Sequence, residues 1–342
     1  MRVAMYYNNR DVRLEEMPVP TIGPGEMLMR IDASGICGSD VLEWYRIHKA
    51  PLVLGHEVAG TVAELGGGGN RYRIGDRIAA SHHVPCFTCH YCMSGHETVC
   101  DTLRTTNFYP GGFAQYLRLP AINVDRGIYH LPEGVDCEEG TFAEPLACVL
   151  RGQRVARFEP GVSVLILGAG ISGLLHIALA RATGAGRIVA TDTNEYRRKA
   201  ALCFGADAAF DATDDIVSRF REINGGLLAE RVVVCTGAMP AMGQALACVD
   251  RGGTVLLFAS TRPDEVFPLN IERTFWRTDI TLTTSYAGSP ADHVRALELI
   301  RSKAIPVTEM ITHRFPLAET QKGFGLVAEA RESIKVIIRP QE

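Results

Sequence analysis

Three glycines at a fixed spacing, Gly168-x-Gly170-x-x-Gly173, follow an unbroken apolar run, Val162–Leu167, and precede an apolar helical pattern. A run this rich in Val, Leu and Ile is typical of a strand that is buried on both faces of a parallel sheet. The first glycine permits a tight turn, the second lets a pyrophosphate approach the backbone, and the third lets the helix pack close to the strand. The order of strand, glycines and helix predicts a dinucleotide-binding unit.

The residues after the glycine turn predict how the dinucleotide would be held. The backbone N–H groups of Ile171 and Ser172, at the helix start, would face its phosphates. Asp192 ends the next apolar strand, at a spacing suited to a carboxylate that bonds both ribose hydroxyls of NAD and repels the extra phosphate of NADP. Arg197 is expected to stack near the adenine or to face water. The alternative is that Asp192 only caps the helix that follows.

Length and charge limit the class of protein. A chain of 342 residues is long for one core, so two domains are expected. The net charge of −4, from 35 basic and 39 acidic residues, gives no electrostatic argument for nucleic acid or an anionic membrane as a partner. No apolar run approaches the length of a membrane span, and the first residues do not resemble a signal peptide, so a cytoplasmic location is expected.

The pattern of secondary structure changes along the chain. Short β-like runs at 2–7, 12–16, 26–34, 57–65 and 77–80, separated by Pro and Gly turns, predict a compact, barrel-like β domain. From about residue 151, strands alternate with helices, which predicts a doubly wound α/β domain. The tail has a long helical pattern at 291–303 and a final strand at 333–339, and we expect it to return to the first domain.

Four cysteines lie within one short segment, with three of them at strict three-residue spacing: Cys86, Cys89, Cys92 and Cys100. Four thiolates fill a tetrahedral zinc shell and leave no position open, as structural zinc sites require. The alternative is four reduced cysteines in an ordinary loop. His90 and His96 lie in the same segment, but four sulfurs already complete the shell, so both are expected to face solvent.

A second metal site needs other ligands. Cys37 follows a predicted strand and His56 follows a loop, and zinc accepts such mixed sulfur and nitrogen donors, with an acid as a third. Each residue taken alone has a simpler interpretation, because Cys37 also suits a buried thiol and His56 a core histidine.

The chain resembles the zinc-dependent medium-chain dehydrogenases/reductases, and within them the sorbitol (polyol) and threonine dehydrogenase branch. The motifs that carry the resemblance are Gly35–Asp40, Gly55–Gly60, Gly75–Arg77, the four-cysteine segment, Glu144–Leu146 and the glycine turn. The resemblance implies a GroES-like catalytic domain at 1–150 with a structural zinc lobe at 86–100, a Rossmann coenzyme domain at 151–288, and a return to the catalytic domain at 289–342.

The resemblance also implies roles for single residues. Cys37 and His56 match the catalytic zinc ligands, Glu57 matches an acid on or beside the metal, and Glu144 matches the acid ligand of the polyol branch. Cys148 is a rival for the position of Glu144. The four clustered cysteines match the structural zinc site of the family.

Two positions depart from the family pattern. Leu42 stands where the family has the outer histidine of a proton relay, although the inner member, Ser39, is present and His48 lies six residues beyond Leu42. Ser285 precedes Tyr286, where polyol dehydrogenases carry an arginine, which weakens the case for sorbitol as the substrate.

The resemblance implies a zinc-dependent enzyme that transfers a hydride between a secondary alcohol and NAD, acting as a homodimer or homotetramer. Strand ends at Cys235, Thr236 and Phe258 are expected to line the nicotinamide side of the cofactor site, and three aromatic residues are candidates for the substrate pocket: Trp44, Phe108 and Tyr286. Two alternatives remain. The first is a catalytically impaired dinucleotide-binding sensor or structural subunit, and the second is a zinc-independent quinone reductase of the same fold.

Overall fold

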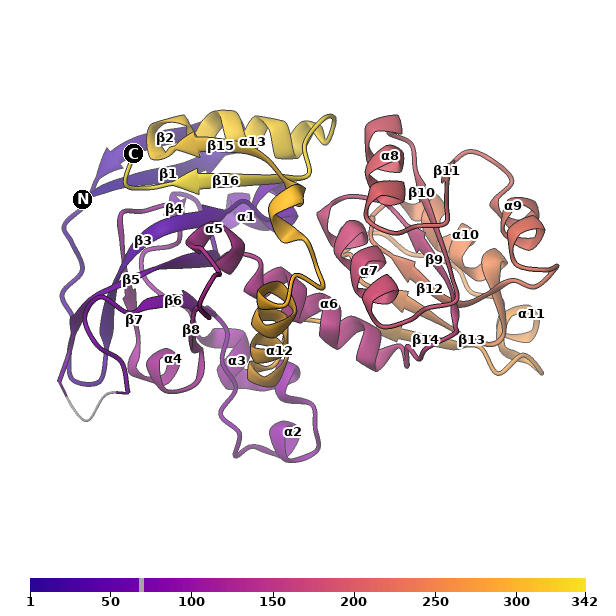
Figure 1. The fold of residues 1–342 in the computed structure, drawn as a ribbon, viewed down its shortest axis with the longest axis horizontal. Coiled ribbons are helices and arrows are strands. Elements are labelled where there is room, and N and C mark those ends of the chain that lie inside the picture. Colours follow the sequence, from indigo (N-terminus) through magenta and orange to yellow (C-terminus); the bar gives the residue numbers. More distant parts are fainter. Residues whose placement is uncertain (68–70) are drawn as a thin grey trace. The chain divides into compact units, whose positions relative to one another are not determined.

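The computed structural model describes residues 1–67 and 71–342, which form two compact units (Figure 1). The first unit contains Met1–Ala147 and Ala287–Glu342, and the second contains Cys148–Tyr286. The first boundary falls inside helix α6 (Ala143–Val155), so one continuous helix carries the chain out of the first unit and into the second.

The first unit is built on a seven-stranded sheet and a smaller three-stranded sheet. The larger sheet has the order β15-β16-β3-β5-β6-β8, with β7 also paired to β3, and the smaller has the order β2-β1-β4. The strands are β1 (Arg2–Asn8), β2 (Asp11–Glu16), β3 (Met27–Gly35), β4 (Leu52–Val53), β5 (Glu57–Leu65), β6 (Arg77–Ala80), β7 (Tyr116–Leu119), β8 (Ile128–His130), β15 (Ile311–Pro316) and β16 (Lys335–Arg339). The helices are α1 (Glu43–Arg46), α2 (His90–Met93), α3 (Asp101–Thr105), α4 (Ala121–Arg126), α5 (Cys137–Gly140), α12 (Pro290–Arg301) and α13 (Thr320–Glu329).

Strands β3 and β5 form the centre of the larger sheet. They pair antiparallel from Met27↔Leu65 to Gly35↔Glu57, with two irregularities in register. Gly60 is needed there, because a Cβ on it would collide with the carbonyl oxygen of Arg30 in β3. This pairing places the ends of the two strands, where Cys37 and His56 lie, next to each other.

The second unit has a six-stranded parallel sheet with the order β11-β10-β9-β12-β13-β14. Its strands are β9 (Ser163–Leu167), β10 (Arg187–Asp192), β11 (Ala208–Asp211), β12 (Ala229–Val234), β13 (Val249–Leu257) and β14 (Thr281–Thr284). Its helices are α7 (Ile171–Ala182), α8 (Glu195–Cys203), α9 (Ile216–Ile223), α10 (Met239–Cys248) and α11 (Ile271–Phe275). Every residue of β9 is buried, as the apolar run predicts, and the predicted α/β fold class is confirmed.

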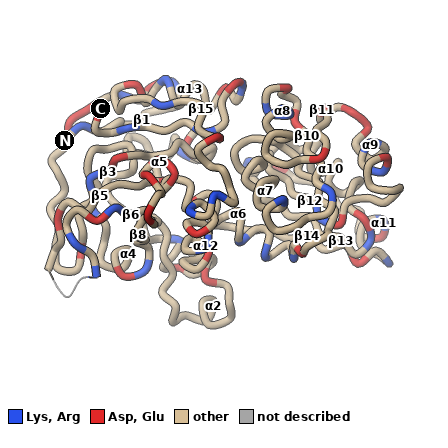
Figure 2. The backbone as a smooth tube through the Cα atoms, viewed as in Figure 1, with Lys and Arg blue, Asp and Glu red and all other residues tan. Residues whose placement is uncertain are grey.

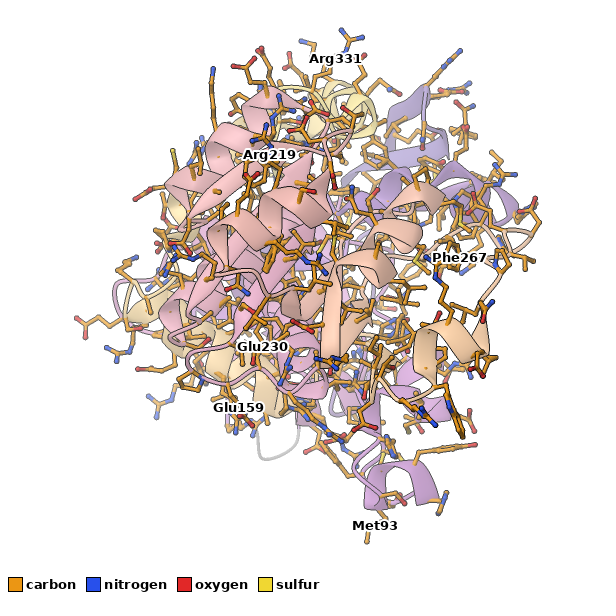
Figure 3. The ribbon with its side chains drawn as sticks, turned by 90° about the vertical axis from the view of Figure 1, so that its right-hand side faces the viewer. Met93, Glu159, Arg219, Glu230, Phe267 and Arg331 are labelled. Carbon is orange, nitrogen blue, oxygen red and sulfur yellow. The ribbon has the colours of Figure 1, made fainter. Side chains whose placement is uncertain are left out.

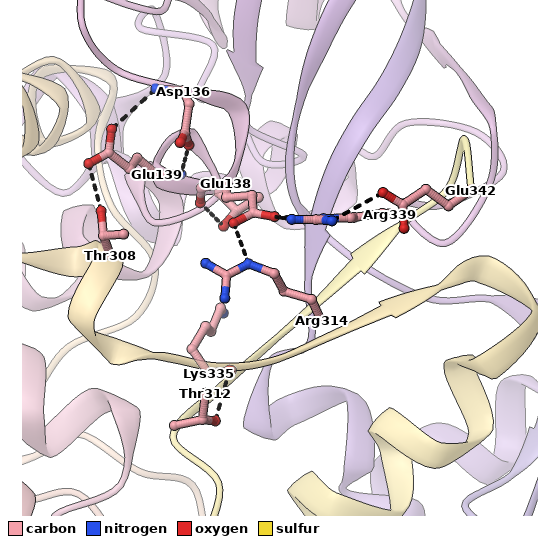
Figure 4. Close-up of polar contacts among 10 residues, drawn as sticks. Asp136, Glu138, Glu139, Thr308, Thr312, Arg314, Lys335, Arg339 and Glu342 are labelled. Carbon is pink, nitrogen blue, oxygen red and sulfur yellow. Dashed lines mark hydrogen bonds and ion pairs between the residues drawn. The ribbon is translucent and has the colours of Figure 1, made fainter.

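The tail contains two elements that the sequence analysis did not predict, strand β15 and helix α13. Strand β16 pairs antiparallel with β3. Two acidic residues of α5 also bind side chains of the tail. Glu138 accepts hydrogen bonds from Arg314 (2.7 Å) and Arg339 (2.8 Å), and Glu139 accepts one from Thr308 (2.8 Å) (Figure 4). The tail is therefore bound to the first unit by backbone pairing and by charged contacts.

None of the helices in the described part of the chain combines the length and the apolar composition that crossing a membrane requires. Lys and Arg are interspersed with Asp and Glu along the backbone of each unit (Figure 2).

Candidate active site and metal centres

Cys37 is held by a short capped turn. It precedes the 3-10 helix η1 (Gly38–Val41), and its Sγ accepts a hydrogen bond from Ser39 N at 3.4 Å. In return, Asp40 Oδ2 accepts one from Cys37 N at 3.0 Å. This reciprocal cap satisfies backbone donors at the start of the turn and fixes the direction of the sulfur.

His56 and Glu57 lie where β5 begins, after Gly55 in a left-handed conformation (φ 92°). One ligand atom each from Cys37, His56 and Glu57 lies within 4.8 Å of the others. Sulfur, nitrogen and oxygen donors are a set that zinc accepts, and three protein ligands leave one position for a substrate. The residues present therefore fit a catalytic zinc ion.

Asp40 orients His56. Its side chain is fully buried, and its Oδ1 lies 3.4 Å from His56 Nδ1. Burial lowers the pKa of His56, but the charges of Asp40 and Cys37 outweigh it and raise that pKa well above the usual value. A carboxylate beside Nδ1 favours metal binding at the other ring nitrogen, Nε2, as is common at metal-binding histidines.

Glu57 has a second partner that the sequence analysis did not find. Its buried carboxylate forms an ion pair with Lys335, whose side chain is also fully buried and lies over the Phe142 ring at 5.5 Å. A Cβ at Gly35 would collide with both charged groups, so glycine leaves the space they occupy. Glu57 is thus both one of the three clustered donors and the partner of a buried cation.

Glu144 lies in the first turn of α6 and is partly buried. Within the described chain, neither Glu144 nor Cys148 belongs to the three-residue group around Cys37. We still predict that an acid, Glu57 or Glu144, completes the ligand shell of the catalytic zinc, and that Cys148 does not.

The second donor set is the lobe that carries the four cysteines. Their sulfurs lie 3.6 Å (Cys89 to Cys92, and Cys86 to Cys100) and 3.9 Å (Cys86 to Cys92) apart. Tetrahedral zinc with Zn–S bonds of about 2.3 Å holds its sulfurs about 3.8 Å apart, so this set fits a closed structural site. Hydrogen bonds from Thr88, helped by Cys89 and Cys100, lower the pKa of Cys86 to about 5, which favours the thiolate that binds metal.

The lobe is an exposed projection attached to the unit through its base. Met93 is 76% exposed and points outward from the tip (Figure 3), and His90 and His96 are exposed, as the sequence analysis predicts. Arg126, at the end of α4, donates hydrogen bonds to Pro85 O (3.0 Å) and Cys86 O (2.7 Å). A single guanidinium therefore anchors the lobe where it begins.

In the second unit, the glycine turn has the conformation that the sequence predicts. Gly168 has φ 95°, and a Cβ on Gly173 would collide with its carbonyl oxygen. Gly170 precedes α7 without a side-chain cap, so the first N–H groups of the helix, including those of Ile171 and Ser172, have no such partner. These groups are available to an anion.

Asp192 is not the N-cap residue of α8, and bonding at the start of that helix is not its only role. Asn194 is the cap, because its Oδ1 accepts a hydrogen bond from Tyr196 N at 2.8 Å. Asp192 instead accepts hydrogen bonds from Ala169 N and Asn194 N, both at 2.8 Å, and so joins the end of β10 to the glycine turn.

Arg197 lies beside the glycine turn. Its guanidinium is within 3.9 Å of the place where a Cβ on Gly170 would be, and its buried Nε has no hydrogen-bond partner in the described structure. Burial lowers the pKa of Arg197, while Asp192 opposes that shift. A partly buried guanidinium at this point is suited to the ribose, adenine or phosphate of a dinucleotide.

The predicted nicotinamide-side residues are close to the same turn. A Cβ on Gly168 would lie 3.3 Å from Cys235 and Thr236, because β9 and β12 are neighbours. Phe258 packs against the edge of His176, with ring centroids 4.6 Å apart. These contacts agree with a position at the strand ends, and the binding roles stay predictions.

The substrate-pocket candidates differ in burial. Phe108 is 4% exposed and packs near His82, whereas Tyr286 is 52% exposed and Trp44 is partly buried. His82 also lies 4.9 Å from the His56 ring, and its buried Nδ1 has no hydrogen-bond partner in the described structure. The sequence analysis gave His82 no role. The one signal available was its position, four residues before Cys86, the first cysteine of the lobe.

Other polar contacts were also missed. Ser285 accepts a hydrogen bond from Arg151 at 2.9 Å, so an arginine from α6 reaches the position where the polyol branch has one. Arg46 donates a hydrogen bond to the Ser39 hydroxyl, and His48 is exposed. The spacing of Arg46 from Ser39 carries no motif from which the contact could have been predicted.

The fold and the two donor sets define a class of protein, a metal-dependent dehydrogenase built on a dinucleotide-binding sheet. Comparison with known proteins agrees. Residues 23–132 match the model of the alcohol dehydrogenase GroES-like domain, and residues 172–302 match that of the zinc-binding dehydrogenases. The chain belongs to the zinc-binding dehydrogenase family, and it is an oxidoreductase.

Relatives of this chain are similar over almost their whole length. The probable D-xylulose reductase A of Aspergillus clavatus is 32% identical, over 96% of this chain and 93% of that protein. The sorbitol dehydrogenase of Bombyx mori is also 32% identical, over 99% of this chain and 98% of that protein. Among solved structures, the alcohol dehydrogenase TADH of Thermus sp. ATN1 has a TM-score of 0.87 and 28% identity, and the match covers 99% of both chains.

Proposed function

We propose that this protein is a zinc-dependent dehydrogenase that transfers a hydride between a secondary alcohol of the polyol, sugar-alcohol or amino-alcohol type and NAD. The observation that carries the proposal is the convergence of Cys37, His56 and Glu57 within 4.8 Å, with His56 oriented by Asp40. Relatives named as sorbitol dehydrogenase and D-xylulose reductase support a polyol as the substrate class. The intact donor set favours an enzyme over a sensor, and over a zinc-independent reductase.

Each residue of the proposed site has a separate role in the reaction. Zinc bound by Cys37, His56 and an acid, Glu57 or Glu144, would supply Lewis-acid polarisation of the substrate oxygen, while the nicotinamide would carry the hydride. Asp40 keeps the His56 ring in one orientation. Ser39, two residues after Cys37, presents a hydroxyl that takes or returns the proton of the substrate oxygen.

The choice of NAD is supported by Asp192. Its carboxylate ends β10 and is held by two backbone N–H groups, which leaves its other lone pairs for ribose hydroxyls. A phosphate on that ribose would meet a like charge. Arg197 has the opposite effect, since a guanidinium nearby would attract such a phosphate. We infer that Asp192 decides the preference for NAD, because it lies closer than Arg197 to the end of β10.

We also propose that the protein is a cytoplasmic homo-oligomer. None of the ten cysteines forms a disulfide in the described structure, as expected in a reducing compartment. Sedimentation or light scattering would give the number of subunits, and a monomer would contradict the second half of this proposal.

The experiment that tests the function is a screen of secondary alcohols and polyols, followed by nicotinamide absorbance, together with metal analysis. We expect turnover with NAD and two zinc ions per chain. His56→Ala should remain folded, retain the structural zinc alone and lose almost all turnover, whereas His90→Ala, in the lobe, should behave as wild type. Near-native activity in His56→Ala would contradict the catalytic assignment.

A further inference from the structure

Arg46 folds back onto Ser39 from the end of α1. Its Nε donates a hydrogen bond to the Ser39 carbonyl oxygen at 3.0 Å, and its Nη2 donates one to the Ser39 hydroxyl at 3.1 Å. The same Nη2 lies 3.6 Å from Asp40 Oδ1, and the Arg46 side chain is only 14% exposed. Three contacts to two adjacent residues fix the guanidinium beside the turn that presents Cys37.

A guanidinium has hydrogen-bond donors and no acceptor. It therefore occupies one lone pair of the Ser39 hydroxyl and cannot accept that hydroxyl's hydrogen. The hydrogen and the second lone pair remain for another group. A histidine at position 42 would be able to accept the hydrogen, but Leu42 cannot form hydrogen bonds through its side chain, and His48 is exposed.

We propose that Arg46 is the positioning residue for Ser39: it sets the rotation of the hydroxyl so that its hydrogen and free lone pair face the substrate oxygen. This inference rests on the proposed function, in which Ser39 handles the substrate's proton. Arg46, which can only donate hydrogen bonds, would thus orient Ser39. The family pattern had led us to expect a histidine at position 42 instead.

Arg46 also faces Asp40, which is shared with His56. Removing Arg46 would therefore disturb a buried carboxylate as well as Ser39, and a loss of activity alone would not separate the two effects. A double-mutant cycle separates them, because an effect that passes through the Ser39 hydroxyl disappears when that hydroxyl is absent.

The cycle compares Arg46→Met, Ser39→Ala and the double variant in kcat, KM, zinc content and thermal unfolding. Ser39→Ala should lower kcat roughly a hundredfold. We expect Arg46→Met to lower kcat roughly tenfold or more with little change in KM, to cause no further loss in the Ser39→Ala background, and to leave zinc at two per chain. Arg46→Lys should restore part of kcat, because a single ammonium donor replaces the fork.

Lys49→Met is the matched control. Lys49 lies over the same Tyr45 ring as Arg46, at 4.9 Å against 4.7 Å, but it is exposed, and no contact between it and Ser39 is seen in the described structure. Lys49→Met should leave kcat unchanged. That result would show that removing a positive charge from this segment does not by itself lower kcat.

Independent, additive losses in kcat would overturn the inference, and so would an unchanged kcat in Arg46→Met. If the wild type turned over no alcohol, the proposed function would fail instead. The unfolding cycle would then still test the contact, because a hydrogen bond between the two side chains makes their effects on the unfolding midpoint non-additive.

Discussion

At the scale of a residue, Asp192 has one observed task and one proposed task. Its carboxylate holds the glycine turn through Ala169 N, and we propose that it also binds the ribose of NAD. Asp192→Ser should raise the KM for NAD about tenfold or more, because a charged hydrogen-bond acceptor is lost. It should also narrow the gap between NAD and NADP, which kcat/KM for both cofactors would measure.

The control for this prediction is Asp211→Ser. Asp211 lies directly across from Asp192 in β11, but it pairs with Arg198 and Thr213 instead of the glycine turn. This variant should keep the cofactor ratio of the wild type. A wild type that prefers NADP would contradict the choice of NAD, whatever the variants do.

At the scale of an element, the cysteine lobe depends on its metal. The segment has two short helical turns and an exposed tip, so few apolar contacts stabilise it. Cys89→Ser opens a closed site and should reduce zinc to one ion per chain and lower the free energy of unfolding by more than about 4 kcal/mol. Metal analysis and chemical unfolding would measure both effects.

Cys203→Ser, which removes an exposed thiol of α8, is the matched control and should change neither quantity. If Cys89→Ser retained two tightly bound zinc ions and wild-type stability, the structural role of the site would be wrong.

Glu139, in helix α5, should make the stability of the first unit depend on pH. Burial raises the pKa of Glu139, but Lys303 and Thr308 outweigh it and lower that pKa below its usual value. Because the folded pKa lies below the unfolded value of about 4.3, the stabilisation is complete above that pH and is lost as the pH falls through the folded pKa. Glu139→Gln should therefore cost about 1–2 kcal/mol near neutral pH, with a smaller difference from wild type in acid.

Unfolding midpoints of both proteins across this pH range would test the prediction. Glu133→Gln, an exposed carboxylate in the loop before α5, serves as the control and should show no such convergence. A cost that stayed constant with pH would contradict the role of the Glu139 charge.

At the scale of the whole molecule, the buried pair of Lys335 and Glu57 joins the last strand to the start of β5. Lys335→Met should cost about 3–5 kcal/mol, because it leaves a buried carboxylate without its cation. Combining it with Glu57→Gln should recover part of that stability. Chemical unfolding of the single and double variants measures both.

Lys322→Met provides the comparison, since Lys322 pairs with Glu319 on the surface of α13 and should contribute less than about 1 kcal/mol. Equal costs for the two lysines would show that the buried pair does not hold the tail.

Local patterns predicted most of the second unit. The strand β9, the turn at Gly168 and the helix after it follow from apolar runs and glycine spacing, which act within a few residues. Strand β15 and helix α13 were missed. Strand β15 is defined by its pairing with β16, and α13 packs on the same sheet and contains Gly323 and Gly325, which are unfavourable inside a helix.

The sequence by itself determined which groups can do chemistry here: four thiolates at close spacing, a cysteine, histidine and acid in short motifs, and a glycine turn before a helix. The cysteine spacing and the glycine turn act within a few residues, whereas Cys37 and His56 converge only because β3 and β5 pair. Only the tertiary structure decided their partners. Lys335 reaches Glu57 across 278 residues of chain, and Asp40 reaches His56 because β3 and β5 pair. These partners arise from packing between distant segments, and no pattern along the chain specifies them.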